Sequence, residues 1–233
     1  MLARQRFTLG LQAPTQDTDI TFDSKNIEQI YAGKVARKYD LSMAHIFARF
    51  KKLAYNASLL QTGDRVLVFC CGTGLDFPHI LKKIGKEGKI VGVDFSTEML
   101  KQAQTKIDKH GWENIELLEA DVTKSIDQLD GEFDVGACTL GMSIIPDYKA
   151  AYLNLSAYVK PQGEIIIGDM QLASGWLASF NPLTLALAKR YGGSPEGHKN
   201  SLELRATMER ELTDLRKREF FFGSYFYCIG RTG

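Results

Sequence analysis

A glycine-bearing turn and the carboxylates that follow it are the residues best suited to chemistry in this chain. The stretch Arg65-Val-Leu-Val-Phe-Cys-Cys-Gly-Thr-Gly-Leu-Asp76 starts as an apolar run and ends in a turn with Gly72 and Gly74. Glycines let the main chain turn tightly and approach a ligand with no Cβ in the way. Asp94 ends the next apolar run, twenty positions beyond Gly74. A carboxylate at this spacing could accept hydrogen bonds from both hydroxyls of a ribose, so the pattern predicts a nucleoside site.

The turn departs from the fingerprint of dinucleotide-binding proteins. That fingerprint has a third glycine three positions after the second, where a helix packs closely around a pyrophosphate. Phe77 occupies this position here. Nicotinamide-dependent reduction is therefore disfavoured, and a different nucleoside ligand is expected.

The elements that must position these residues alternate between strand-like and helical patterns. Strands are predicted at 66–69, 90–94, 135–139 and 164–169, and the segment 115–122 is predicted to be a strand followed by an acidic turn. Helices are expected between the strands, with a further turn at 160–163. This βαβ rhythm predicts parallel strands joined by right-handed crossovers. After an apolar stretch at 176–191 and a loop at 192–195 comes a charged helix at 201–212. The runs 218–222 and 225–231 then predict a closing hairpin.

The order of these motifs resembles that of class I S-adenosylmethionine-dependent methyltransferases. Their first motif usually reads hydrophobic-Leu-Asp-hydrophobic-Gly-Cys-Gly-Thr-Gly, and this chain matches it at positions 71–74. The resemblance implies an α/β fold with a Rossmann-like, seven-stranded, mostly parallel sheet, a C-terminal antiparallel hairpin, helices on both faces and an N-terminal helical cap. It implies S-adenosylmethionine as cofactor and S-adenosylhomocysteine as product.

Two departures from that motif bear on activity. Val68 replaces the acid of the family and Cys70 replaces its first glycine. In the family this acid helps to hold the loop and the methionine end of the cofactor, so water, a carbonyl or another acid such as Asp76 would meet the ammonium here. A catalytically inactive cofactor-binding or scaffolding module is therefore an alternative.

The resemblance also implies a set of cofactor-binding residues. Asp94 would hold the ribose and Asp121 the adenine amine, and Tyr31 and Tyr39 could cover the sulfonium because aromatic faces attract cations. Each of the last three has a structural alternative, a cap for Asp121 and core packing for the two tyrosines. The full predicted set is Tyr31, Tyr39, Cys71, Gly72, Thr73, Gly74, Asp94, Phe95, Met99, Asp121, Val122, Thr139 and Leu140.

Shorter motifs resemble two kinds of bacterial enzyme within this class. The segments 140–147 and 222–231 and the long lid are similar to enzymes that N-methylate phosphatidylethanolamine or diacylglyceryl-homoserine, and to enzymes that C-methylate ubiquinone and menaquinone precursors. We favour an amine acceptor on a lipid head group, with C-methylation of a quinone precursor as the alternative. Candidates for holding the acceptor or taking its proton are Tyr31, His45 and Asp169; His45 could equally be a helix-surface residue, and Asp169 a cap.

The chain divides into three predicted regions. Residues 1–22 form a flexible arm, 23–62 an N-terminal helical cap, and 63–233 the Rossmann-like core with a lid at about 170–211. The cap is inferred from two amphipathic helical patterns before the first strand. The apolar stretch 176–191 is a lid, a pocket wall or an element that touches a membrane surface.

The amino-acid composition limits which classes of partner the protein is expected to bind. With 29 Lys+Arg against 28 Asp+Glu, the net charge of +1 predicts no broad electrostatic surface for nucleic acid. The four cysteines match no zinc pattern, and His79, His110 and His198 lack the spacing of a metal site, so no metal is expected. The amino terminus has no apolar core of signal-peptide length, which predicts a cytoplasmic protein, with the inner membrane face as a second location. A small or amphiphilic acceptor is the expected partner.

Overall fold

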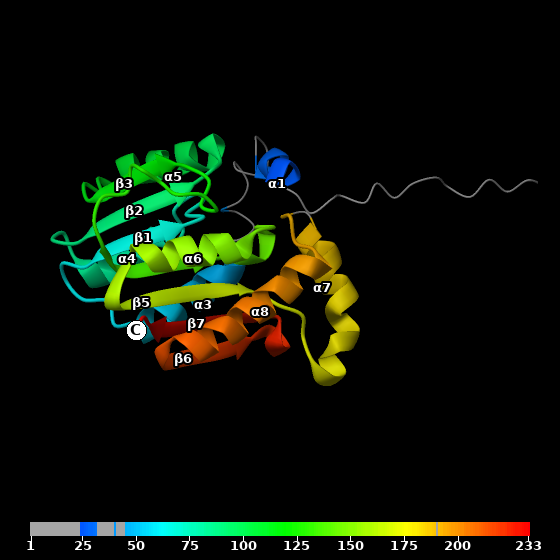
Figure 1. Ribbon diagram of the computed structural model, residues 1–233. Helices are drawn as coiled ribbons and strands as arrows, with labels where there is room; N and C mark the ends of the chain where they lie inside the picture. Colours follow the sequence, from blue (N-terminus) through cyan, green and yellow to red (C-terminus); the bar gives the residue numbers. More distant parts are fainter. Residues whose placement is uncertain (1–23, 32–39, 41–44, 190) are drawn as a thin grey trace, which may run out of the picture.

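The computed structural model describes residues 24–31, 40, 45–189 and 191–233 (Figure 1). The predicted arm therefore lies outside the described residues. The elements follow in the order α1 (Ser24–Tyr31), α3 (His45–Ala57), β1 (Arg65–Phe69), α4 (Phe77–Ile84), β2 (Lys89–Asp94), α5 (Thr97–His110), β3 (Ile115–Glu119), β4 (Phe133–Thr139), η2 (Met142–Ile144), α6 (Tyr148–Tyr158), β5 (Val159–Met170), η3 (Gly175–Phe180), α7 (Asn181–Lys189), α8 (Pro195–Glu211), β6 (Thr213–Phe220), η4 (Phe221–Gly223) and β7 (Tyr225–Arg231).

The strands form one seven-stranded sheet in the order β3-β2-β1-β4-β5-β7-β6. The first five strands in this order pair in parallel, whereas β7 runs antiparallel to both β5 and β6. This architecture confirms the predicted fold class. The strand order reverses at β1 and β4, which is the place where open α/β sheets bind ligands.

Two apolar layers cover the two faces of the sheet. Along β1, Val66 and Val68 pack with α3, α4 and α5 on one face. Leu67 and Phe69 pack with α6 and α8 on the other face. A strand that is buried on both sides needs apolar residues at every position, which explains why β1 reads as a continuous apolar run.

Three elements differ in extent from the prediction. The predicted turn at 160–163 lies inside the long strand β5, where the pairing with β4 shifts register and Gln162 takes a positive φ of 63°. Strand β6 begins at Thr213 rather than at Arg218. Helix α8 begins at Pro195 rather than at Ser201, because Ser194 caps it by accepting a hydrogen bond from Gly197 N at 2.9 Å. Sheet pairing thus extends β5 and β6 over polar residues, whereas a local cap extends α8.

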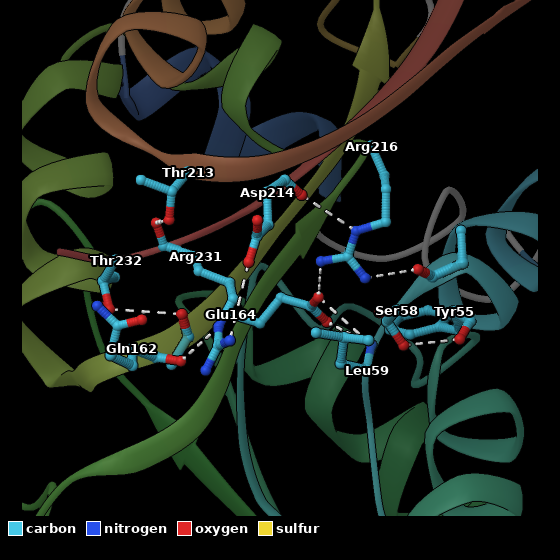
Figure 2. Close-up of polar contacts among 12 residues, drawn as sticks. Tyr55, Ser58, Leu59, Gln162, Glu164, Thr213, Asp214, Arg216, Arg231 and Thr232 are labelled. Atoms are coloured by element: carbon cyan, nitrogen blue, oxygen red, sulfur yellow. Dashed lines mark hydrogen bonds and ion pairs between the residues drawn. The ribbon is translucent and has the colours of Figure 1, made fainter.

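A buried carboxylate ties the cap to the edge of the sheet (Figure 2). Glu164, at 3% exposure, accepts from Leu59 N at 3.0 Å and forms an ion pair with Arg216. Arg216 also donates to the carbonyl of Ala57 at 2.9 Å. The end of α3 is thereby fixed to β5 and β6, so the cap has a defined position on the core.

The remaining elements lie beyond the carboxyl ends of the parallel strands. Helix α1 stands near the end of β1, and α7 lies outside the sheet next to α8 (Figure 1). Among the described helices, none has the length and apolar character needed to cross a bilayer. The division into cap, core and lid remains a proposal about how the domain is organised.

Candidate active site

The site forms where β1 and β4 end side by side. The first residue after each strand, Cys70 and Leu140, has a positive φ, 51° and 59° respectively. Left-handed backbone is unfavourable for residues other than glycine by about 1–2 kcal/mol. The main chain thus turns sharply at the end of both strands, at the point where the strand order reverses. Cys70, which stands where the family motif has glycine, thus adopts a conformation that favours glycine.

A cavity of about 310 Å³ opens at this point. Its size lies within the usual range for small-molecule sites. The described residues that line it are Ile27, Tyr31, Cys70, Gly72, Asp94, Phe95, Met99, Ala120, Asp121, Val122, Thr123, Leu140, Ile144, Ile145 and Pro146. The predicted cofactor residues Tyr31, Gly72, Asp94, Phe95, Met99, Asp121, Val122 and Leu140 are therefore brought together here. Their roles toward a cofactor stay predictions.

Asp94 presents a buried carboxylate to this cavity. One oxygen accepts from Gly72 N at 2.8 Å and the other from Ser96 N at 2.9 Å. Burial raises the pKa of Asp94 to about 6, although hydrogen bonds from the main chain of Ser96 and Gly72 act in the opposite direction. Each carboxylate oxygen keeps lone pairs beyond these bonds, so the group can accept two further hydroxyls. This arrangement fits the sugar of a nucleoside.

Gly72 leaves room for such a ligand. Its φ is 54°, and a Cβ built there would lie 3.2 Å from the terminal methyl of Met99. A larger residue would therefore press on one of the cavity walls. Together with the acceptor capacity of Asp94, this cradle shows that the residues present fit a nucleoside cofactor.

Asp121 is exposed at the other end of the cavity. Its carboxylate accepts from the main-chain N and the hydroxyl of Thr123, at 3.0 and 2.7 Å, and pairs with Lys124 at 3.2 Å. Partial burial acts to raise the pKa of Asp121, but the hydrogen bonds from Thr123 and Lys124 outweigh it and lower the pKa. Asp121 therefore caps a turn instead of a helix, and its carboxylate still lines the cavity.

Four predicted cofactor residues do not line the cavity. Cys71 is buried beside Gly92 of β2, Thr73 donates its hydroxyl hydrogen bond to Asp40, and Gly74 packs against the ring of Phe77. These three residues support the conformation of the loop and do not line the cavity. The fourth, Thr139, donates its hydroxyl to the carboxylate of Asp76 and so faces the interior instead of the ligand.

Asp76 was a candidate to meet the cofactor's ammonium, and the structure gives it another partner. Its carboxylate pairs with the buried ammonium of Lys51 at 2.8 Å. The predicted residue Tyr39 lies outside the described residues, and the side chain of His45, at the start of α3, is likewise outside them.

A second cavity of about 450 Å³ adjoins the first and shares Tyr31, Leu140 and Ile144 with it. Its lining is mostly apolar and comes from α1, α3, η2, the end of β5, the segment 173–198 (called the lid segment below, after the predicted lid) and the turn between β6 and β7. The other residues along it are Phe47, Ser143, Asp169, Met170, Ala173, Leu177, Phe180, Thr184, Ala188, Tyr191, Gly193, His198, Phe221 and Ser224. A small ligand in the first cavity would therefore adjoin an apolar acceptor in the second.

Two of the catalytic candidates touch this second cavity. The hydroxyl of Tyr31 donates to the carbonyl of Tyr191 at 3.0 Å, which joins α1 to the lid segment. Asp169 accepts from the Ser143 hydroxyl at 2.6 Å, from Ser143 N at 2.8 Å and from Met170 N at 2.7 Å. Burial raises the pKa of Asp169 above its usual range despite these bonds. Its three donors hold the carboxylate in one orientation.

Several lining residues were not predicted. Ile27 belongs to the apolar face of α1, and that periodicity could have identified it. Ile144 and Ile145 follow β4 in the segment whose resemblance was used only to choose a subgroup. His198 was considered only as a metal ligand.

The described residues hold no cluster of three or more His, Cys, Asp or Glu side chains that could bind a metal ion. The four cysteines are free thiols. Burial raises the pKa of the Cys71 thiol well above its usual value, which makes the neutral, poorly nucleophilic form dominant.

Solved structures share the fold. A SAM dependent methyltransferase from Aquifex aeolicus superposes with a TM-score of 0.64 at 20% identity, over 85% of this chain and 97% of that one. An O-methyltransferase family protein from Burkholderia thailandensis gives a TM-score of 0.70 at 13% identity, over 91% and 63% of the two chains. At these identities the likeness establishes the fold.

Curated relatives include two bacterial proteins named demethylmenaquinone methyltransferase. The one from Listeria welshimeri is 28% identical over 154 residues, which cover 64% of this chain and 65% of the relative. The one from Bacillus cereus is 31% identical over 137 residues, or 57% of each chain. The matched part thus spans less than two thirds of either relative.

The model of the ubiE/COQ5 methyltransferase family matches residues 20–173. This range contains α1, α3, the glycine turn and the first five strands, and therefore most of the residues around the first cavity. The match confirms the resemblance to class I S-adenosylmethionine-dependent methyltransferases and, with it, the predicted cofactor class. The chain belongs to the ubiE/COQ5 methyltransferase family.

Proposed function

We propose that this protein methylates a ring carbon of a hydroquinone, with S-adenosylmethionine as the methyl donor. The observation that carries the proposal is the pair of adjoining cavities: one has a buried carboxylate suited to a sugar, and the other is mostly apolar. The names of the relatives favour this acceptor over the lipid amine that we preferred from the sequence.

The residues of the first cavity would hold the cofactor. Asp94 would accept the ribose hydroxyls, Gly72 would let the main chain approach, and Asp121 with Val122 would meet the adenine. When bound, S-adenosylmethionine supplies an electrophilic methyl group on a sulfonium. The chain's own contribution is then mainly orientation, which can lower a barrier by about 7–11 kcal/mol in favourable cases.

The second cavity would hold the acceptor. Leu177, Phe180 and Ala188 offer apolar contacts for a ring and the start of a hydrocarbon tail, and Ser143 and Asp169 offer the polar contacts that orient a hydroxyl. Closure of the lid segment over this cavity would exclude water from the reacting carbon. An amphiphilic substrate also fits the exposed apolar side chains of η3 and α7, which we propose touch a membrane surface.

The test is a transfer assay with methyl-labelled S-adenosylmethionine and three acceptors: a short-chain demethylmenaquinol, phosphatidylethanolamine vesicles and no acceptor. We expect label on a ring carbon of the quinol, located by mass spectrometry. Label on the lipid amine would favour the other acceptor class. An inactive scaffolding module, suggested by Val68 and Cys70, predicts no transfer with either acceptor; calorimetric titration with S-adenosylhomocysteine would then show whether cofactor binding is retained.

A further inference from the structure

His198 lines the second cavity, which we propose holds the acceptor, and lies outside the cofactor cavity. It occupies the first turn of α8, lines the second cavity and is 1% exposed. The family match ends at residue 173, so nothing in that match assigns it a role. Buried imidazoles at ligand cavities are common acids and bases, because their pKa is close to neutral pH.

The hydrogen bonding of the ring fixes its tautomer. Nδ1 lies 2.6 Å from the carbonyl oxygen of Ser194. A carbonyl can only accept, so Nδ1 carries the proton in this bond, and in the neutral ring Nε2 carries the lone pair. Among the described residues, Nε2 is buried and has no hydrogen-bond partner. A buried acceptor without a donor is unfavourable, which points to a donor that arrives with a ligand.

The start of α8 is held firmly against the polar end of the cavity. A Cβ on Gly197 would lie 1.9 Å from the carbonyl oxygen of Ser143, so only glycine permits this approach. Ser143 in turn donates to Asp169. The imidazole, the serine hydroxyl and the carboxylate therefore belong to one rigid corner of an otherwise apolar cavity.

Asp169 is less suited to accept the acceptor's proton. Three of the four lone-pair sites of its carboxylate already accept hydrogen bonds, from Ser143 N, the Ser143 hydroxyl and Met170 N. The Nε2 lone pair has no such bond to break. Of the two groups, His198 is the one whose acceptor atom has no hydrogen bond at all among the described residues.

We propose that Nε2 of His198 binds the ring hydroxyl of the acceptor and takes its proton during methyl transfer; this rests on the proposed function. As the O–H bond breaks, its electron pair moves into the ring, and the neighbouring ring carbon bonds the methyl group while the S–CH₃ pair stays on sulfur. That carbon then releases its own hydrogen as a proton, the ring regains aromaticity, and the imidazolium returns its proton to oxygen. One proton is released overall.

Two substitutions separate the parts of this role. In His198→Asn the amide can replace the Nδ1 hydrogen bond to Ser194 but leaves nothing at the Nε2 position. In His198→Gln an amide oxygen can reach that position, where it accepts a hydrogen bond but cannot take a proton. We expect transfer to demethylmenaquinol to fall about a hundredfold or more in both variants. The affinity for S-adenosylhomocysteine, measured by calorimetry, should be unchanged, because α8 contributes nothing to the first cavity.

A binding assay tests the same role without turnover. Protein saturated with S-adenosylhomocysteine is titrated with 1-naphthol and with 1-methoxynaphthalene, which lacks the hydroxyl. The unmodified protein should prefer 1-naphthol about tenfold, His198→Gln should keep part of this preference, and His198→Asn should lose it. Equal binding of the two probes to the unmodified protein, or full turnover in His198→Asn, would overturn the assignment. A preference for 1-naphthol that depends on His198, with no transfer to any quinol, would instead refute the proposed reaction and uphold the hydroxyl site.

Discussion

The ammonium of Lys51 lies 2.8 Å from the carboxylate of Asp76, and both side chains are almost completely buried. Lys51 belongs to α3 of the N-terminal cap, whereas Asp76 stands at the start of α4, directly after the glycine turn. The hydroxyl of Thr139, at the end of β4, also bonds Asp76, at 2.8 Å. This cluster links α3, the glycine turn and the end of β4 from the interior side.

Removing one partner of this pair should destabilise the protein strongly. In Lys51→Met the carboxylate of Asp76 stays buried without its counter-charge, which costs about 3–5 kcal/mol in comparable cases. The double variant Lys51→Met with Asp76→Leu should recover much of that loss, because an apolar pair needs no desolvated charge. Urea unfolding of the three proteins measures both effects.

An exposed pair of similar length provides the control. Lys89 and Glu116 are 2.6 Å apart, but each side chain is nearly half exposed. Lys89→Met should change stability by at most about 1 kcal/mol. Equal losses in the two lysine variants would show that burial is not what makes the Lys51 pair important.

Cofactor affinity should depend on pH through Asp94. The pKa of Asp94 is about 6 in the free protein, so its carboxylate is half protonated at pH 6. Ribose hydroxyls bond best to the charged form, so the Kd for S-adenosylhomocysteine should rise as the pH falls below 6, by up to about tenfold per pH unit. Calorimetric titration between pH 5 and 8 measures this.

Protonation of Asp94 would not by itself destabilise the fold in acid. Because the pKa of Asp94 is raised on folding, the folded state binds more protons than the unfolded state, and this group stabilises the fold as the pH falls through 6. Asp121→Asn is the matched variant, since the pKa of Asp121 is lowered and the group stays charged over this range. It should weaken binding and leave the pH dependence in place. A pH-independent Kd in the unmodified protein would contradict the role of Asp94.

The sheet and much of the first cavity could be predicted from local signals. Alternating strands and helices predicted the sheet, and Asp94 at a strand end predicted a nucleoside site, because parallel strands bring their carboxyl ends to one edge. The family resemblance implied Asp121 and the other cofactor residues. The sequence has no comparable signal for Lys51. Its burial arises from a contact between segments 25 residues apart, and an isolated lysine on an amphipathic helix predicts a solvent-exposed side chain.

The acceptor cavity was harder to predict for a related reason. The pair Gly192-Gly193 followed by Ser194-Pro195 suggested a loop, yet Ser194 and Pro195 are the cap and first residue of α8. A serine followed by proline is also a helix-start signal, and the tight contact of Gly197 with Ser143 could not be read from local residues. Because the helix was predicted to begin at Ser201, the prediction left His198 outside the helix that positions it.

Gly197→Ala should impair the acceptor site without affecting the cofactor site. The added methyl would meet the carbonyl oxygen of Ser143, and overpacking of this kind costs about 1–3 kcal/mol. A shift of α8 would move His198, so the KM for the quinol should rise while the Kd for S-adenosylhomocysteine stays the same. Steady-state kinetics and calorimetry give the two values.

Gly111→Ala is the control for a glycine substitution. Gly111 has a positive φ of 63° at the end of α5, and a Cβ added there would have no atom of the described residues within 4 Å beyond its chain neighbours. Its substitution strains the backbone by about 1–2 kcal/mol and should leave the KM for the quinol unchanged. If both variants raise that KM equally, the contact between α8 and η2 has no special role.

The outer face of the lid segment should bind membranes. Trp176 and Leu183 are 77% and 62% exposed on η3 and α7, while Leu177, Phe180 and Ala188 of the same elements line the acceptor cavity. Burying each large apolar side chain in lipid contributes about 1.5–3 kcal/mol. The double variant Trp176→Ser with Leu183→Ser should therefore weaken vesicle binding by about a hundredfold or more. Sedimentation with phosphatidylcholine vesicles measures this, and turnover of a water-soluble short-chain quinol should not change.

Leu153→Ser is the control, because Leu153 is 64% exposed on α6, away from the lid. Equal vesicle binding by all these variants would rule out a membrane contact through this face.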